Sequence, residues 1–118
     1  MVKNMISLDD VISKINKFNM SLDKILKVKI YLPTIEKFNF LDEYKKIIKE
    51  HESDYPDYAE YVDLVFFNLM IIKKYTNIEF DMTYESFDKM QQNKIIGYVV
   101  GCMEEDYELL LNLVKLNR

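Results

Sequence analysis

The sequence predicts a mainly α-helical fold: a single domain of about five helices around a buried central helix, with a small two-stranded β ribbon as an optional addition. A chain of 118 residues matches one domain with one core. Because 49% of the residues are hydrophobic and 14% aromatic, the composition is that of a folded chain rather than a disordered one. Several segments repeat apolar residues every three or four positions, the period of an α-helix. The domain is therefore expected to span residues 1–118.

The first helix is expected to begin at Ser7 and to end at about Phe18. Serine is a favoured N-cap residue, and Asp9 and Asp10 carry negative charge where the helix dipole is positive. Apolar residues recur at helical spacing through this segment, which indicates one buried face.

Two segments have the alternating pattern of short β-strands. Residues 26–32 alternate apolar and basic side chains around Lys27 and Lys29, and Pro33 ends the pattern. Residues 78–82 alternate again. Because two strands alone are marginally stable, we expect this ribbon to pair and to lie on the helices.

The next two helices include the centre of the fold. A second helix is predicted over residues 33–50, and its apolar residues are Ile35, Phe38, Leu41, Tyr44, Ile47 and Ile48. After a loop at residues 53–57, Asp57 and Glu60 resemble a capping pair that opens a third helix ending at about Tyr75. This helix is apolar in almost every direction, which is typical of the buried centre of a fold or of half an oligomer interface.

The last third of the chain is predicted to be helical. Thr83 suits the N-cap of a short helix, and residues 95–103 continue as an apolar segment. Glu104, Glu105 and Asp106 then place three acids at the start of a final helix.

Charge and composition exclude several classes of function. The net charge of −4 argues against nucleic-acid binding by the whole surface, and the single arginine argues against base-specific recognition. Residues 1–50 have a net charge of +3 and residues 51–118 a net charge of −7, which predicts head-to-tail self-association or an acidic docking face, unless both are ordinary solvated faces. With one cysteine, no visible signal peptide and no membrane span, a reducing cytosol is the expected location.

No catalytic, cofactor or metal site is predicted. His51 is the only histidine and is expected to be a surface or capping residue at a helix end. Cys102 is followed by acids rather than bases, which is typical of a buried, unreactive thiol. The acids lack the spacing of a calcium loop, so a small enzyme with a carboxylate metal site stays an alternative without a motif. Another alternative is a nucleic-acid binder that uses Lys24, Lys27, Lys29, Lys45, Lys46 and Lys49.

A cluster of tyrosines is the best candidate for a partner-binding surface. Tyr55, Tyr58 and Tyr61 stand close together with acids on both sides. Tyrosine is enriched at protein interfaces because it combines contact area with a hydroxyl group. Helical spacing allows an equal alternative, in which Tyr58 and Tyr61 lie at the edge of the core. The acids Glu104, Glu105 and Asp106 complete the predicted partner-binding set.

Four short segments carry a family resemblance. Residues 28–33, residues 36–37, the YTNI corner within residues 74–78 and the acidic helix start at residues 104–107 follow one another in the chain. In this order they resemble uncharacterised small accessory proteins of tailed bacteriophages and prophages, over about residues 28–118. The resemblance implies a non-enzymatic structural or assembly component that works through contacts with other proteins, in the host cytoplasm or in the virion. The alternative is a phage-encoded inhibitor of a host defence or replication protein, which would bind through its acidic surface.

Overall fold

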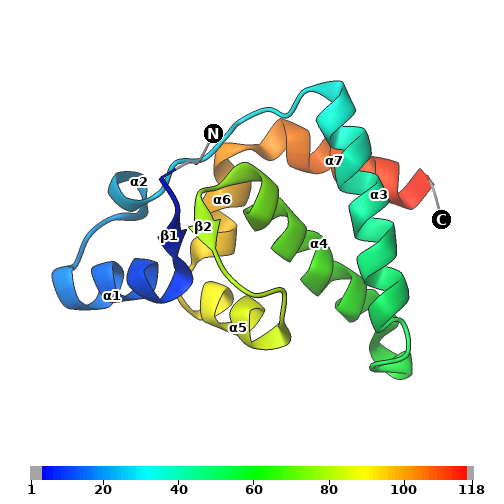
Figure 1. The fold of residues 1–118 in the computed structure, drawn as a ribbon, viewed down its shortest axis with the longest axis horizontal. Coiled ribbons are helices and arrows are strands. Elements are labelled where there is room, and N and C mark those ends of the chain that lie inside the picture. Colours follow the sequence, from blue (N-terminus) through cyan, green and yellow to red (C-terminus); the bar gives the residue numbers. More distant parts are fainter. Residues whose placement is uncertain (1–3, 117–118) are drawn as a thin grey trace.

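Helix α4 (Ala59–Tyr75), which is rich in apolar residues, lies at the centre of the fold (Figure 1). The computed structural model describes residues 4–116. Ten of the 17 residues of α4 are buried, so the prediction of a buried central helix is confirmed. The predicted start at Asp57 is wrong. Residues 56–58 form the 3-10 turn η1 (Pro56–Tyr58), and no side chain caps α4.

The helices that pack around α4 share one hydrophobic core with it. Helix α3 (Thr34–His51) packs along α4, where the rings of Phe40 and Tyr44 both meet the ring of Phe67 edge-on at 5.7 Å. Helices α5 (Tyr84–Gln92) and α6 (Ile95–Cys102) cover other sides of α4. Helix α7 (Glu104–Leu116) packs against α3 and α6. The mainly α-helical fold is confirmed, with seven α-helices within residues 4–116 where about five were expected.

Two of the predicted helix starts are confirmed by their capping geometry. Helix α1 (Leu8–Phe18) begins after Ser7, whose hydroxyl oxygen accepts a hydrogen bond of 3.1 Å from the backbone N–H of Asp10. Thr83 caps α5 in the same way and accepts from the backbone N–H of Ser86 at 3.1 Å. The short helix α2 (Leu22–Ile25) follows Ser21, which makes no such bond. Side-chain caps therefore fix the starts of α1 and α5 but not that of α2.

The β ribbon differs from the prediction. Strand β1 (Ile6–Ser7) pairs in parallel with β2 (Ile78–Glu79), with Ile6 opposite Ile78. Residues 26–32 do not form a strand and make only one isolated bridge, between Val28 and Thr76.

The segment of residues 26–33 is extended for another reason, and we call it the strap. It runs past the C-terminal end of α4, where the backbone N–H of Lys29 donates to the carbonyl oxygen of Tyr75 at 2.7 Å. The backbone N–H of Lys27 donates to the side-chain oxygen of Asn77 at 3.1 Å. Leu26 and Leu32 are buried whereas Ile30 is exposed. The buried side chains of Leu26 and Leu32 thus hold the two ends of the strap against the core.

No helix of the described chain combines the length and the apolar character that crossing a bilayer requires.

The caps provide a matched test of local stability. We expect Ser7→Ala to lower the free energy of unfolding by about 1 kcal/mol, because the N–H of Asp10 loses its acceptor. Ser21→Ala is the control, since Ser21 makes no capping bond. Urea unfolding followed by circular dichroism measures both. Equal losses in the two variants would contradict the assignment of the Ser7 cap.

Candidate functional site

The three tyrosines that the sequence singles out are all exposed on one surface. Tyr55, Tyr58 and Tyr61 are 53%, 67% and 57% exposed, and Leu64 beside them is 42% exposed. They lie before and within η1 and in the first turns of α4. We call these four residues the tyrosine surface. This exposure places Tyr58 and Tyr61 outside the buried core, which is compatible both with a partner-binding surface and with the edge of the core.

The tyrosine surface is held in place by a few ring contacts. The ring of Tyr55 meets the ring of Tyr84 edge-on at 5.7 Å, and that of Tyr61 meets Phe87 at 6.3 Å. No ring contact of Tyr58 is present within residues 4–116. Tyr58 is therefore the member of this surface that contributes least to the fold.

A row of three hollows begins at the tyrosine surface. The first is an open hollow of about 700 Å³ lined by residues 56–61 and Leu64. Glu60 and Leu64 also line the second, of about 290 Å³, which reaches α7 at Val114. Neighbouring hollows share lining residues and therefore adjoin one another, and we call this row the groove.

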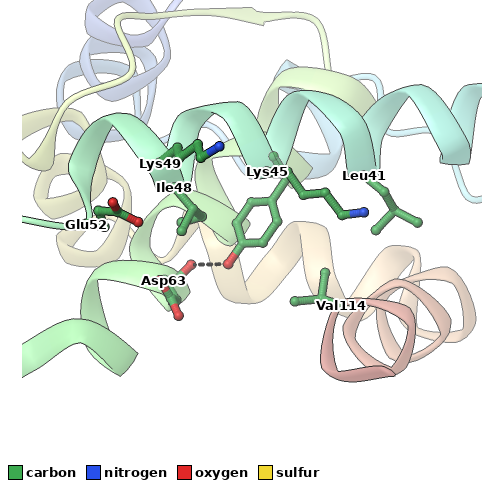
Figure 2. Close-up of a pocket in the computed structure, with 8 residues that line it drawn as sticks. Leu41, Lys45, Ile48, Lys49, Glu52, Asp63 and Val114 are labelled. Atoms are coloured by element: carbon green, nitrogen blue, oxygen red, sulfur yellow. Dashed lines mark hydrogen bonds between the residues drawn. The ribbon is translucent and has the colours of Figure 1, made fainter. Parts of the chain in front are cut away.

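The far end of this groove lies between α3, the start of α4 and the end of α7 (Figure 2). Its cavity of about 370 Å³ has apolar walls from Leu41, Ile48 and Val114. Tyr44 also lines it, and the Tyr44 hydroxyl donates to the backbone carbonyl of Asp63 at 3.1 Å. Sequence reasoning missed this groove because its lining comes from three helices that are distant along the chain.

Acidic residues surround the tyrosine surface. Residues 50–72 contain six aspartates and glutamates and no lysine or arginine. Asp57 and Glu60 are exposed directly beside the tyrosines. The surface is therefore both aromatic and negatively charged.

Asp54 organises the residues behind the tyrosine surface. Its carboxylate accepts hydrogen bonds of 2.7 Å from the hydroxyl of Tyr84 and from Nδ1 of His51. Both bonds lower the pKa of Asp54 below its ordinary value, and the bond from Tyr84 has the larger effect. The ring of His51 also stacks on Phe66 at 4.1 Å, so the histidine at the end of α3 joins the loop to the core.

The predicted acidic members of the site lie elsewhere. Glu104 and Glu105 are exposed in the first turn of α7, but Asp106 is only 5% exposed. The Asp106 carboxylate accepts from the hydroxyl of Tyr75, at the end of α4 opposite to the tyrosine surface. The structure thus separates the predicted set into two regions, and Asp106 is not a surface residue.

Asp106 instead belongs to a buried polar network, which we call the Asp106 network. Its carboxylate oxygens lie 3.3 Å from Nζ of Lys37 and accept bonds of 2.8 Å from the backbone N–H of Leu32 and from the hydroxyl of Tyr75. Lys37 donates to the carbonyl oxygen of Leu32 at 2.7 Å, and its ammonium group lies 3.8 Å from the centre of the Tyr31 ring. Burial, followed by the bond to Asp106, raises the pKa of Tyr75 above its ordinary value. Each buried polar side chain of this network has a hydrogen-bond or ion-pair partner within the fold. We therefore assign the network a structural role.

The other chemistry-bearing residues form no catalytic grouping in the described part of the chain. No group of three His, Cys, Asp or Glu side chains within residues 4–116 could hold a metal ion. Cys102 was expected to be buried but is partly exposed. Its thiol hydrogen-bonds with Tyr98 and raises the pKa of that tyrosine above its ordinary value.

Comparison with known proteins gives no match: no protein-family model, no curated protein and no solved structure matches the chain. Its function therefore has to be inferred from its exposed surfaces and their chemistry. The tyrosine surface and its groove are one such feature, with four apolar or aromatic side chains that the core does not bury.

Breaking the Asp106 network is expected to destabilise the fold. Asp106→Asn leaves the buried ammonium group of Lys37 without a counter-charge, so we expect the free energy of unfolding to fall by about 3–5 kcal/mol. Adding Lys37→Met removes this buried charge and should recover part of the loss. Glu105→Gln, an exposed neighbour, is the control and should cost less than about 1 kcal/mol. Urea unfolding measures all three variants, and a similar small effect of Asp106→Asn and Glu105→Gln would contradict this role.

Tyr84 is expected to ionise above the ordinary pKa of a tyrosine. Burial and then the bond to Asp54 raise its pKa from 10.0 to about 12. A raised phenol pKa contributes stability below pH 10, and this contribution is lost as the pH rises through 12. Asp54→Asn should lower the pKa only part of the way, because burial is the larger cause. Carbon NMR of labelled tyrosine rings measures both proteins. Titration of Tyr84 near pH 10 in the unchanged protein would contradict the expectation.

Proposed function

We propose that the protein acts by binding another protein, without catalysing a reaction, as a structural or assembly component of a bacteriophage. The observation that carries this proposal is the exposure of Tyr55, Tyr58, Tyr61 and Leu64 together on one surface. Exposed apolar patches with polar rims mark interaction sites, and tyrosine is frequent among the residues that contribute most to binding.

A comparison of the tyrosines supports a binding role for this surface. Tyr44 and Tyr75 are buried, and their hydroxyl groups are bonded to Asp63 and Asp106 inside the fold. Tyr58 has neither burial nor a ring contact within the described residues. A large aromatic side chain that contributes so little to its own core is best explained by a partner that covers it.

The groove adds depth to this surface. A partner that covers Tyr58 and Tyr61 also meets the hollow at Leu64, from which the groove continues to Val114. Binding sites that combine a central aromatic cluster with a pocket bury apolar area efficiently. The acids at the edge supply the polar rim.

The narrower proposal of a phage component rests on the resemblance of residues 28–118 to small accessory proteins of tailed phages. Proteins of that kind act through contacts with other proteins. The exposed tyrosine surface agrees with such a role.

The alternative proposal is a phage-encoded inhibitor of a host defence or replication protein. One observation favours it: Glu104 and Glu105 are exposed at the first turn of α7, where they present two negative charges. Such a surface suits a basic site on a host protein.

Affinity capture tests the proposal and separates it from the alternative. The tagged chain is used to capture proteins from bacteria in which a tailed phage encoding it is multiplying, and the captured proteins are identified by mass spectrometry. We expect phage structural or assembly proteins, and Tyr58→Ala should reduce their capture about tenfold or more, as for a residue at the centre of an interface.

The matched control is Phe18→Ala, because Phe18 is as exposed as Tyr58 but lies at the end of α1. Equal capture by both variants would contradict the binding role of the tyrosine surface. Capture of a host nuclease or replication protein alone, with loss on Glu104→Lys, would instead support the inhibitor.

A further inference from the structure

The chain has a second exposed apolar surface, at the opposite end of α3 from the tyrosine surface. Ile30, Tyr31, Ile35 and Phe38 are between 53% and 70% exposed, and we call them the strap surface. The sequence predicts Ile35 and Phe38 on the buried face of their helix, which the structure contradicts. They lie in the first turns of α3, beside the strap (Figure 1).

The two surfaces differ in charge. Residues 24–35 contain three lysines and no acid, and Lys27 and Lys29 are exposed on the strap. Residues 50–72, around the tyrosine surface, contain six acids and no lysine or arginine. Glu36 lies beside the strap surface, and Glu104 and Glu105 are exposed at the same end of the molecule, next to Asp106, which bonds to Leu32 of the strap. Lys45, Lys49 and Lys115 line the hollows beyond Leu64. The strap surface is therefore apolar with Lys27 and Lys29 at its start, and the tyrosine surface is aromatic with Asp57 and Glu60 beside it.

We propose that the protein associates with itself head to tail, with the strap surface of one copy seated on the tyrosine surface of the next. This inference rests on the proposed function and names its partner as a second copy of the chain. Ile30, Ile35 and Phe38 would be covered by Tyr58, Tyr61 and the hollow at Leu64. Lys27 and Lys29 would lie beside Asp57 and Glu60, so apolar burial and charge favour the same arrangement.

A symmetric dimer is disfavoured by the same charges. In a two-fold interface each surface meets its own copy, which would place the acids around Tyr58 against identical acids. Like charges at an interface oppose association. A head-to-tail contact pairs opposite charges instead.

The positions of the surfaces determine what such an association builds. They lie at opposite ends of α3, an 18-residue helix about 27 Å long. One copy therefore cannot satisfy its own two surfaces. Each bound copy leaves one surface of each kind free, so association continues until a ring closes or a filament forms.

Charge reversal on each surface tests this arrangement without any other protein. The first variant carries Lys27→Glu and Lys29→Glu, and the second carries Asp57→Lys and Glu60→Lys. Each has lost one surface and retains the other. Light scattering across a range of concentrations at low salt gives the mass in solution, and circular dichroism verifies that each variant is folded.

We expect the unchanged protein to form particles larger than a monomer, and each variant alone to associate about tenfold or more weakly. An equal mixture of the two variants should recover association, because the unchanged surface of each variant meets the unchanged surface of the other and the two reversed surfaces again carry opposite charges. Association should weaken as salt is raised towards about 1 M, where charges are screened beyond about 3 Å.

Two control variants carry the same changes in charge on other surfaces. Lys14→Glu with Lys17→Glu changes α1, and Glu79→Lys with Asp81→Lys changes the segment at β2. Both should associate like the unchanged protein. Association that persists in the strap variant, or is lost equally in the controls, would overturn the assignment of the two surfaces.

A strict monomer at high concentration and low salt would overturn this inference. Tyr58-dependent capture of a different protein could still be observed in that case, and the proposed function would stand. Loss of Tyr58-dependent capture of every partner, including a second copy, would overturn both.

Discussion

The buried pair of Lys37 and Asp106 is the interaction on which the arrangement of the remaining elements depends. Two charges have been removed from water, which is favourable only where geometry and additional hydrogen bonds offset the loss of hydration. Leu32 and Tyr75 supply these bonds, with the donors of both directed at one carboxylate oxygen. Since the partners come from the strap, α3, α4 and α7, the network fixes the relative positions of four segments. Its main contribution is to select one arrangement of these segments.

This network also explains why apolar side chains are exposed at one end of the molecule. Leu32 is buried and bonded through both its N–H and its carbonyl oxygen, so the strap cannot shift to bury Ile30 in its place. The Tyr31 ring is held over the ammonium group of Lys37 and stays more than half exposed. The exposed strap surface is thus a consequence of how the interior is bonded. Burying it requires another molecule.

The sequence predicts the helices well because their signals are local. Ser7 and Thr83 cap the helices that were expected, and the all-round apolar pattern before Tyr75 identifies the centre. The prediction of a strand at residues 26–32 was wrong, because an extended segment that lies on a helix end produces the same alternation of apolar and polar residues as a half-buried strand. For Asp106, the sequence shows an acid at a helix start, a position that is usually exposed. Its partner Lys37 is distant along the chain, so no local pattern reveals their pairing.

The candidate site was predictable to a similar extent. Three tyrosines close together in the sequence remain together on the surface because the turn η1 and α4 are continuous. The positions of the groove and of the strap surface depend on which face of α3 packs against α4. The helical period of the sequence alone does not determine that face. Exposed apolar residues reduce solubility, and the charges beside them favour some partners over others. The net charge of −4 is therefore less informative than where the individual charges lie in the fold.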